Sequence, residues 1–245
     1  MTTPQPLGPA TGLNVVHFFC RANPNVDKAA VAKAVAQALD DGLQVVSAAI
    51  MGAKADICFM LLGENLWDLR KFQSRIQAAG LEVAESYVSV TEISEYAGGM
   101  PEEMITARLF PVLPPEGLRA FCFYPMSKRR GDKNNWYSLP YDERAQLMRQ
   151  HGKSGKEFKG RILQVVTGST GLDDWEWGVT LFGAHIDDLK DCVYTMRFDE
   201  ASTLYAEFGA FYTDVYKRQL QPRLWLCRNG HCLRNRSARQ CNPAA

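Results

Sequence analysis

The strongest constraint on the fold of this chain is an order of apolar segments that occurs twice. Within residues 13–91 a strand-like run is followed by a helical pattern that ends at Gly42, and then by two strand-like runs. A second helical pattern ends at Gly80 and is followed by an alternating strand. Strand, helix, strand, strand, helix, strand is the order of a ferredoxin-like unit.

The same order occurs again in the second half of the chain. Strands are predicted at residues 118–126, 160–170, 174–183 and 210–215, with helices at 140–151, ended by Gly152, and at 187–209. We therefore predict an α+β fold of two ferredoxin-like βαββαβ halves, residues 13–99 and 100–215. Two such units can place their sheets side by side as a barrel, which covers their edge strands. A single larger mixed sheet is the alternative.

Both ends of the chain differ from these halves. Residues 1–12 have neither a basic region nor an apolar stretch of a secretory signal, and we expect a disordered lead. Residues 216–245 contain 7 basic and no acidic residues, which is typical of a disordered basic extension or a frame-shifted end. A zinc site in this tail is disfavoured by the spacing of its candidate ligands, which are Cys227, His231, Cys232 and Cys241.

Charge and cysteine usage restrict the class of protein. Before Tyr216 the chain has 21 Lys and Arg against 27 Asp and Glu, a net charge of −6, which gives little support to nucleic-acid binding. No apolar run approaches the roughly 20 residues that cross a bilayer, so we expect no membrane partner. The other cysteines are isolated in apolar segments, as in a reducing compartment, and we expect a cytoplasmic protein; they are Cys20, Cys58, Cys122 and Cys192.

A cluster of cations between two aromatic residues is the most unusual local feature. Converging Lys and Arg side chains suit an anion with several carboxylates, although a solvated turn is the ordinary interpretation. Tyr124 precedes the cluster at a strand end, where a packing role is the usual one, and Trp136 follows it. The cations are Lys128, Arg129, Arg130 and Lys133.

His151 is a candidate ligand at the end of a predicted helix. Its spacing from Leu147 and Met148 places all three on one face, which we expect to face the sheet. From spacing alone, a histidine favoured by the negative helix end is the more common case. Asp173 and Asp174 beside two tryptophans could form a sugar site, but an exposed turn explains them as well.

The segments "YPMSKRR" and "GLDDWEWGVTLF" resemble the coproheme decarboxylase branch of the chlorite dismutase superfamily. The resemblance covers residues 13–212 and is densest after Met100. It implies two ferredoxin-like halves in one chain, assembled as a homopentamer. It also implies that iron coproporphyrin III (coproheme) binds in the second half and that hydrogen peroxide drives the removal of two propionates as carbon dioxide, which leaves heme b.

The resemblance also implies roles for individual residues. His151 corresponds to the iron ligand, Tyr124 to the tyrosine whose radical attacks a propionate, and Lys128 to the lysine near that propionate. Trp136 corresponds to an aromatic residue that lines the pocket. The remaining correspondences are Arg108 and Ser202, which hold propionates, and Gln164, the distal residue.

Three departures from relatives bear on the reaction. Chlorite dismutases carry an arginine at the position of Gln164, so chlorite is disfavoured as a substrate. Some relatives use a distal histidine as the base for peroxide, and no histidine here corresponds to it. Phe110 stands where some relatives have a tyrosine. The alternatives to a decarboxylase are a heme-binding or heme-transfer protein without turnover, and a chlorite dismutase-like or peroxidase-like heme enzyme.

Overall fold

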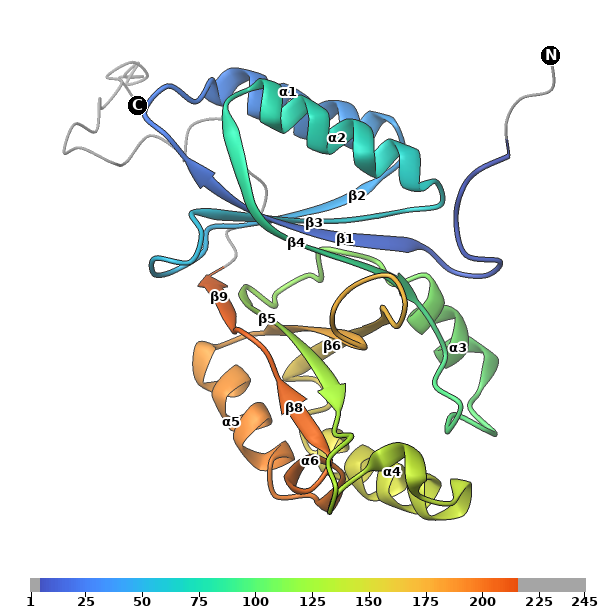
Figure 1. The fold of residues 1–245 in the computed structure, drawn as a ribbon. Coiled ribbons are helices and arrows are strands. Elements are labelled where there is room, and N and C mark those ends of the chain that lie inside the picture. Colours follow the sequence, from blue (N-terminus) through green and yellow to red (C-terminus); the bar gives the residue numbers. More distant parts are fainter. Residues whose placement is uncertain (1–4, 216–245) are drawn as a thin grey trace, which may run out of the picture.

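A computed structural model describes residues 5–215 of the chain (Figure 1). In the first half, two helices pack on one side of four strands. The elements are β1 (Asn14–Ala22), α1 (Lys28–Asp40), β2 (Gln44–Ala48), β3 (Ile57–Gly63), α2 (Leu66–Ala78) and β4 (Leu81–Thr91).

The second half carries the larger set of helices. Its elements are α3 (Glu102–Leu109), β5 (Ala120–Lys128), the 3-10 turn η1 (Trp136–Ser138), α4 (Tyr141–Lys156), β6 (Ile162–Gly168), β7 (Trp177–Gly183), α5 (Ile186–Met196), α6 (Glu200–Thr203), β8 (Ala206–Phe208) and β9 (Tyr212–Val215). Figure 1 shows α4, α5 and α6 on the side of this half that faces away from the first half.

All strands of the described chain belong to one nine-stranded sheet. The order is β2-β3-β1-β4-β6-β7-β5-β8, and β9 also pairs with β5. Every strand pair is antiparallel, and β4 joins the halves by pairing with β6 at Val90↔Gly168 and Thr91↔Thr167. The prediction of an α+β fold is confirmed. The strands form a single larger sheet, as in the alternative prediction, but all strand pairs within residues 5–215 are antiparallel, so this sheet is not mixed.

The two halves share a core between their strands. One buried cluster combines side chains of the first half, such as Phe19 and Met60, with Phe121, Phe123 and Phe182 of the second. At about 25 cal/mol per Å² of apolar surface, each of these side chains contributes roughly 1.5–3 kcal/mol. The halves are therefore held together by burial as well as by the β4–β6 pairing.

Hydrogen bonds from the loop after β2 fix the last strand. Met51 N donates to the carbonyl of Thr213 at 2.9 Å, and Ala49 N donates to the carboxylate of Asp214 at 2.7 Å. The Lys54 ammonium donates to the carbonyl of Phe211 at 2.6 Å. The first half therefore holds the segment that enters β9.

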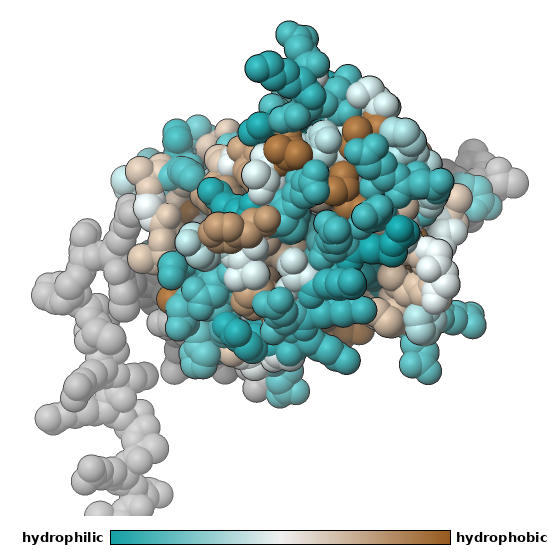
Figure 2. Space-filling model, turned by 90° about the horizontal axis from the view of Figure 1, so that it is seen from below, coloured by the Kyte–Doolittle hydropathy of each residue, from teal (hydrophilic) through white to brown (hydrophobic). Residues whose placement is uncertain are grey.

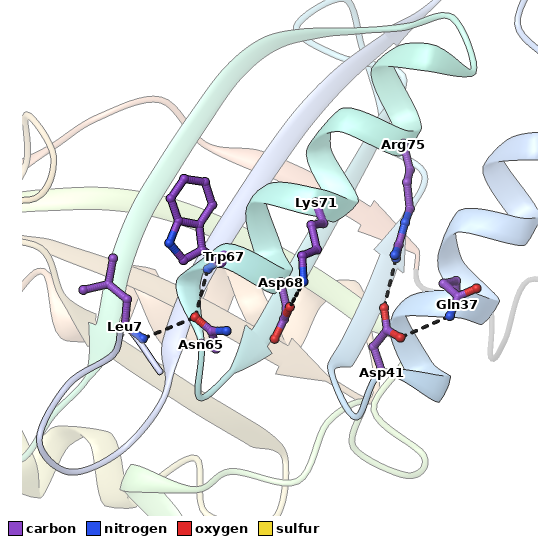
Figure 3. A network of polar contacts seen from close by, with 8 residues as sticks. All are labelled: Leu7, Gln37, Asp41, Asn65, Trp67, Asp68, Lys71 and Arg75. Carbon is purple, nitrogen blue, oxygen red and sulfur yellow. Dashed lines mark hydrogen bonds and ion pairs between the residues drawn. The ribbon is translucent and has the colours of Figure 1, made fainter. Parts of the chain in front are cut away.

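Helices α1 and α2 form an outer layer over the first half (Figure 1). The buried face of α2 consists of Leu69, Phe72 and Ile76, at the spacing that the sequence predicts. On the exposed side Arg75 pairs with Asp41 at 3.1 Å (Figure 3). Asn65 caps α2 and also accepts a hydrogen bond from the backbone of Leu7, so part of the predicted disordered lead contacts the helix.

Two helices differ from the sequence prediction. Helix α4 continues to Lys156 and does not end at Gly152, because that glycine keeps a helical conformation at an exposed position. The helix predicted over 187–209 ends at Met196, and a short second helix, α6, begins after Asp199. Asp199 is extended and accepts a hydrogen bond from the backbone N–H of Ser202, which is the geometry of a helix N-cap.

No helix in residues 5–215 is long and apolar enough to span a bilayer. The candidate zinc ligands of the tail lie outside the described residues.

His17 is a fully buried histidine at the junction of the halves. Its Nε2 lies 3.0 Å from the hydroxyl of Thr180, and its Nδ1 has no hydrogen-bond partner among the described residues. The ring lies 4.2 Å from that of Phe123. Burial lowers the pKa of His17 from 6.5 to about 3, so the ring is neutral in the folded protein.

We expect His17→Gln to make the protein less sensitive to acid. Between pH 6.5 and 3 the unfolded chain binds a proton that folded His17 does not, so the free energy of unfolding falls by about 1.4 kcal/mol per pH unit. From pH 6.5 to 5 the parent should lose about 2 kcal/mol more than the variant. Urea unfolding at both pH values measures this difference. Equal losses in the two proteins would show that His17 is not kept neutral by burial.

Candidate functional site

The register of the second half places two predicted site residues on one face of the sheet. Tyr124 pairs with Val179, which pairs with Val166 on β6. Gln164 pairs with Leu181, one row further along the same face. Paired residues in antiparallel strands project to the same side, so we call this side of β6, β7 and β5 the site face.

Part of the site face is not covered by protein side chains. Helix α5 packs on it through Leu189 and Val193, over Cys122 and Leu181. On β6, however, Gln164 is exposed and Val166 is 41% exposed, although β6 is an interior strand of the sheet. An apolar residue exposed at the centre of a sheet indicates a surface for a flat ligand.

Tyr124 lies at the covered side of this face. Its ring stacks on Phe211 with centroids 4.5 Å apart and meets the edge of Phe208 at 5.7 Å. Burial raises the pKa of the Tyr124 phenol well above its usual range, so the phenol keeps its proton at neutral pH. A neutral phenol between aromatic rings is suited to hydrogen-atom donation more than to acid–base work.

Lys128 follows Tyr124 by four residues on the same face and is buried, with 8% exposure. Its ammonium donates to the carbonyl of Ala201 at 3.0 Å and lies 4.3 Å from the ring centroid of Trp136. Burial lowers the pKa of Lys128 to about 8, against the opposing effect of Asp199 and Glu176. Lys128 is therefore charged at neutral pH and is the buried cation of the cluster.

The other cations of the cluster lie toward the solvent. Arg130 contacts Glu176 at 3.1 Å, and Arg129 lies 3.8 Å from Glu207, while Lys133 is exposed. The Arg129–Glu207 pair is exposed on both sides and contributes roughly 0–1 kcal/mol, whereas the exposed Arg130 pairs with a buried carboxylate. These cations can attract an anion, but only Lys128 is held inside the protein.

His151 is oriented by a buried carboxylate. Its Nδ1 lies 3.0 Å from Asp199 Oδ2, and the Asp199 side chain is 5% exposed. Burial alone would raise the pKa of Asp199, but the bonds to His151 and to the Ser202 N–H hold it below its usual value. The carboxylate therefore fixes the ring and leaves Nε2 as the nitrogen that can bind a ligand.

Helix α6 connects His151 to Lys128. Asp199 caps this helix, and its next residues include Ala201, the acceptor for Lys128, and the buried Ser202. Trp136 and Tyr205 pack against Ala201 and against Leu147 of α4. The structure thus brings together four predicted site residues, His151, Lys128, Trp136 and Ser202, around α6.

Arg108 is not part of this group. It lies in α3, whose residues are exposed or half-buried, and no contact joins it to the other predicted site residues in the described chain. The candidate sugar site is not supported either, because Asp173 accepts the backbone N–H of Val88 at 2.9 Å and serves to join β4 to the turn before β7.

Sequence reasoning missed Asp199 and Glu176. Asp199 falls inside the helix predicted over 187–209, because the pattern does not predict the break between α5 and α6. Glu176 is buried and accepts the backbone N–H of Lys128 at 2.7 Å, which fixes the end of β5. Asp199 is followed by an acidic residue and then by small residues, which is a helix N-cap signal in the sequence and could have identified Asp199.

The comparisons with known proteins agree with this arrangement. A family model described as chlorite dismutase matches residues 26–217. The chain belongs to the chlorite dismutase family. This membership covers both halves of the fold and includes every predicted site residue.

Solved structures of similar proteins support the same fold. A heme-binding protein from Thermus thermophilus is 33% identical, with a TM-score of 0.74, and the match covers 86% of this chain and 95% of that one. A mutant chlorite dismutase from Candidatus Nitrospira defluvii is 18% identical, with a TM-score of 0.65, covering 84% and 92%. The second likeness shows the fold alone.

The residues present fit a heme group. Metal-bound histidines usually donate their other ring N–H to a carboxylate, which is what His151 and Asp199 provide. The uncovered part of the site face exposes Val166, and Lys128 on the same face offers a cation for a carboxylate. Within residues 5–215 no group of three or more His, Cys, Asp or Glu side chains converges.

The surface around the site is largely hydrophilic. Figure 2 looks onto the side of α4, α5 and α6 and shows hydrophobic residues exposed in separate places among hydrophilic ones. The exposed apolar side chains of the second half include Val166, Tyr194 and Phe198.

We expect Lys128→Met to stabilise the protein at neutral pH. The pKa of Lys128 is lowered from 10.5 to about 8, so charging it costs the folded state about 3 kcal/mol below pH 8. Losing the bond to Ala201 offsets about 1 kcal/mol, which leaves a gain of about 2 kcal/mol. Urea unfolding at pH 7 measures the gain, which should largely disappear by pH 10.5, where the folded lysine is neutral and half of the unfolded lysine is neutral.

The exposed Lys133 gives a matched control. Lys133→Met should change the free energy of unfolding by less than about 0.5 kcal/mol at either pH. If Lys128→Met proved less stable than the parent at pH 7, the ammonium would contribute to folding and its burial would need another explanation.

Proposed function

We propose that this protein catalyses the hydrogen peroxide-dependent oxidative decarboxylation of coproheme to heme b. The observation that carries the proposal is the joining of His151, Lys128 and Ser202 through Asp199 and α6, beside the uncovered site face with Tyr124. The proposal includes a fold of two ferredoxin-like halves, assembly as a homopentamer and a cytoplasmic location.

Lys128 and Ser202 would bind one propionate of the substrate. The Lys128 ammonium is buried and charged at neutral pH, and the Ser202 hydroxyl lies on the helix whose carbonyl Lys128 contacts. A charge-assisted hydrogen bond in a buried site is stronger than one in water. The cations Arg129, Arg130 and Lys133 would attract the tetra-anionic substrate to this edge, and Arg108 would hold a second propionate.

His151 would bind the iron of the substrate through Nε2. The Asp199 carboxylate holds Nδ1–H, which fixes the tautomer and makes Nε2 a better donor. Hydrogen peroxide and the iron of the substrate supply the oxidising equivalents. Gln164 projects from the opposite side, on the site face, and is neutral, so it does not attract an oxychlorine anion.

Tyr124 would remove a hydrogen atom from the β-carbon of the propionate. For each propionate, hydrogen peroxide and one proton are consumed, and a vinyl group, carbon dioxide and two water molecules are formed. Phe208 and Phe211 keep water from the phenol ring, which protects a radical from side reactions. Trp136 would line the pocket and hold the Lys128 ammonium in place.

A heme-binding protein without turnover is the second candidate. The 33% identical relative from Thermus thermophilus, described as heme-binding, favours it. Simple binding does not require a phenol on the site face beside a buried ammonium, and this combination is why we prefer the decarboxylase. A chlorite dismutase-like or peroxidase-like activity is the third and is disfavoured by Gln164.

The deciding experiment loads the protein with ferric coproheme and adds hydrogen peroxide in steps. Mass spectrometry of the extracted porphyrin should show the loss of two carboxyl groups in succession, ending at heme b. Tight binding without a change in mass would support the heme-binding candidate and contradict the decarboxylase.

Tyr124→Phe should abolish decarboxylation and leave coproheme affinity within about threefold of the parent. The ring and its stacking on Phe211 remain, and only the reactive O–H is lost. Product analysis and Soret titration measure the two quantities. Tyr194→Phe, a change at an exposed position of α5, is the control and should convert coproheme at the parent rate. Conversion at the parent rate by Tyr124→Phe would disprove the radical role.

Asp199→Asn should weaken coproheme binding by about 10–100-fold, the usual effect of losing a hydrogen-bond partner of a metal-bound histidine. The amide oxygen can still cap α6, so the fold should be retained, as circular dichroism would show. His151→Ala should shift the Soret band as well as reduce affinity. An unchanged band in His151→Ala would mean that another group binds the iron.

A further inference from the structure

Glu92 follows β4 and projects onto the site face. β4 pairs with β6 at Val90↔Gly168 and Thr91↔Thr167, and Glu92 is the next residue after this pairing. A Cβ placed on Gly168 would overlap the Glu92 carboxylate, which shows that the carboxylate lies on the side of β6 where a side chain of Gly168 would project. Val166 projects to that same side.

A hydrogen bond holds the carboxylate in this position. The indole N–H of Trp177 donates to Glu92 Oε1 at 3.1 Å. Trp177 pairs with Gly168 and with Met126, so it too lies on the site face. Because Gly168 has no side chain, there is room beside it for the Glu92 carboxylate, which the Trp177 indole orients through Oε1. The other carboxylate oxygen of Glu92 remains available to accept a proton.

Glu92 is the one carboxylate on the site face within the described strands. By register, the other positions of this face on β5, β6 and β7 carry no Asp or Glu. Glu92 is therefore the one carboxylate there that can serve as a base. Its side chain is exposed, so small molecules can reach it.

Glu92 and Tyr124 lie at opposite ends of the site face. Strands β6 and β7 lie between β4 and β5, so three strand spacings, about 14 Å, separate Glu92 from Tyr124. His151 lies on α4, so Glu92 on the sheet and His151 on the helix would face a flat ligand from its two sides.

We propose that Glu92 is the proton acceptor for hydrogen peroxide in this protein, an inference that rests on the proposed function. The Glu92 carboxylate takes one proton from hydrogen peroxide as the peroxide binds. It returns this proton to the oxygen that leaves as water when the O–O bond breaks, so the carboxylate is regenerated. No distal histidine is needed, because the sheet provides the base.

The test compares the parent with Glu92→Gln after loading with ferric coproheme. Hydrogen cyanide must also lose a proton to bind ferric iron, but it is not oxidised, so its association rate reports the base separately from turnover. At pH 7 this rate, followed at the Soret band by stopped flow, should fall about 100-fold, the lower end of the effect of a general base. Peroxide consumption should fall by a similar factor, with coproheme affinity unchanged.

Matched variants make the result specific. Glu82→Gln, an exposed position of the same strand, should leave both rates at the parent value. Glu92→Asp keeps a carboxylate and should recover part of the loss, whereas a purely structural role for the Trp177 bond would be served as well by the glutamine oxygen.

The outcomes separate the two proposals. Cyanide association within twofold of the parent in Glu92→Gln, with normal coproheme binding, would overturn the role of Glu92 and leave the proposed function standing. A parent protein that binds no coproheme would overturn the proposed function and the role of Glu92 with it.

Discussion

The carboxylate of Asp199 is the interaction on which the arrangement of the site depends. From one buried position it caps α6, binds Nδ1 of His151 and favours the charged form of Lys128 by raising its pKa against the effect of burial. A buried carboxylate is tolerated only when its oxygens are satisfied, and here a helix N-terminus and an imidazole satisfy them. His151 on α4 and Lys128 on β5 therefore have their relative positions set by a residue that belongs to neither element.

The sheet contributes the other side of the site through its register. Because paired residues project to one side, Tyr124, Gln164 and Glu92 share a face although they come from three strands. The opposite face of the same strands packs into the core between the halves, around Phe121, Phe123 and the neutral His17. Successive residues of β5 project to opposite sides of the sheet, so Tyr124 lies on the site face and its neighbour Phe123 packs into the core.

Much of the fold could be predicted from the sequence, because strand and helix patterns are local. The α+β class, the elements of the first half and the inward face of α2 required only neighbouring residues, whereas α3 was not predicted and β8 lies within the helix predicted over 187–209. The break after Met196 could not be predicted from periodicity, because the apolar spacing of α5 continues past it. The extent of α4 was also missed, since an exposed glycine can remain helical.

Part of the site could be proposed from resemblance, but the contacts within it depend on long-range pairing. His151 and Asp199 are 48 residues apart, and Trp177 and Glu92 are 85 apart. No local pattern indicates that these side chains meet. The burial of Lys128, in contrast with its neighbours Arg129 and Arg130, likewise depends on the position of α6.

The hydrogen bond from Lys54 to the carbonyl of Phe211 has a consequence for how this protein can evolve. Phe211 stacks on Tyr124, so a loop of the first half supports the aromatic wall around the Tyr124 phenol. The second half could not be transplanted alone with this wall intact, because its last strand would lose the partners that align it. A change in the loop around Lys54 therefore reaches the surroundings of Tyr124, and the two halves must change together.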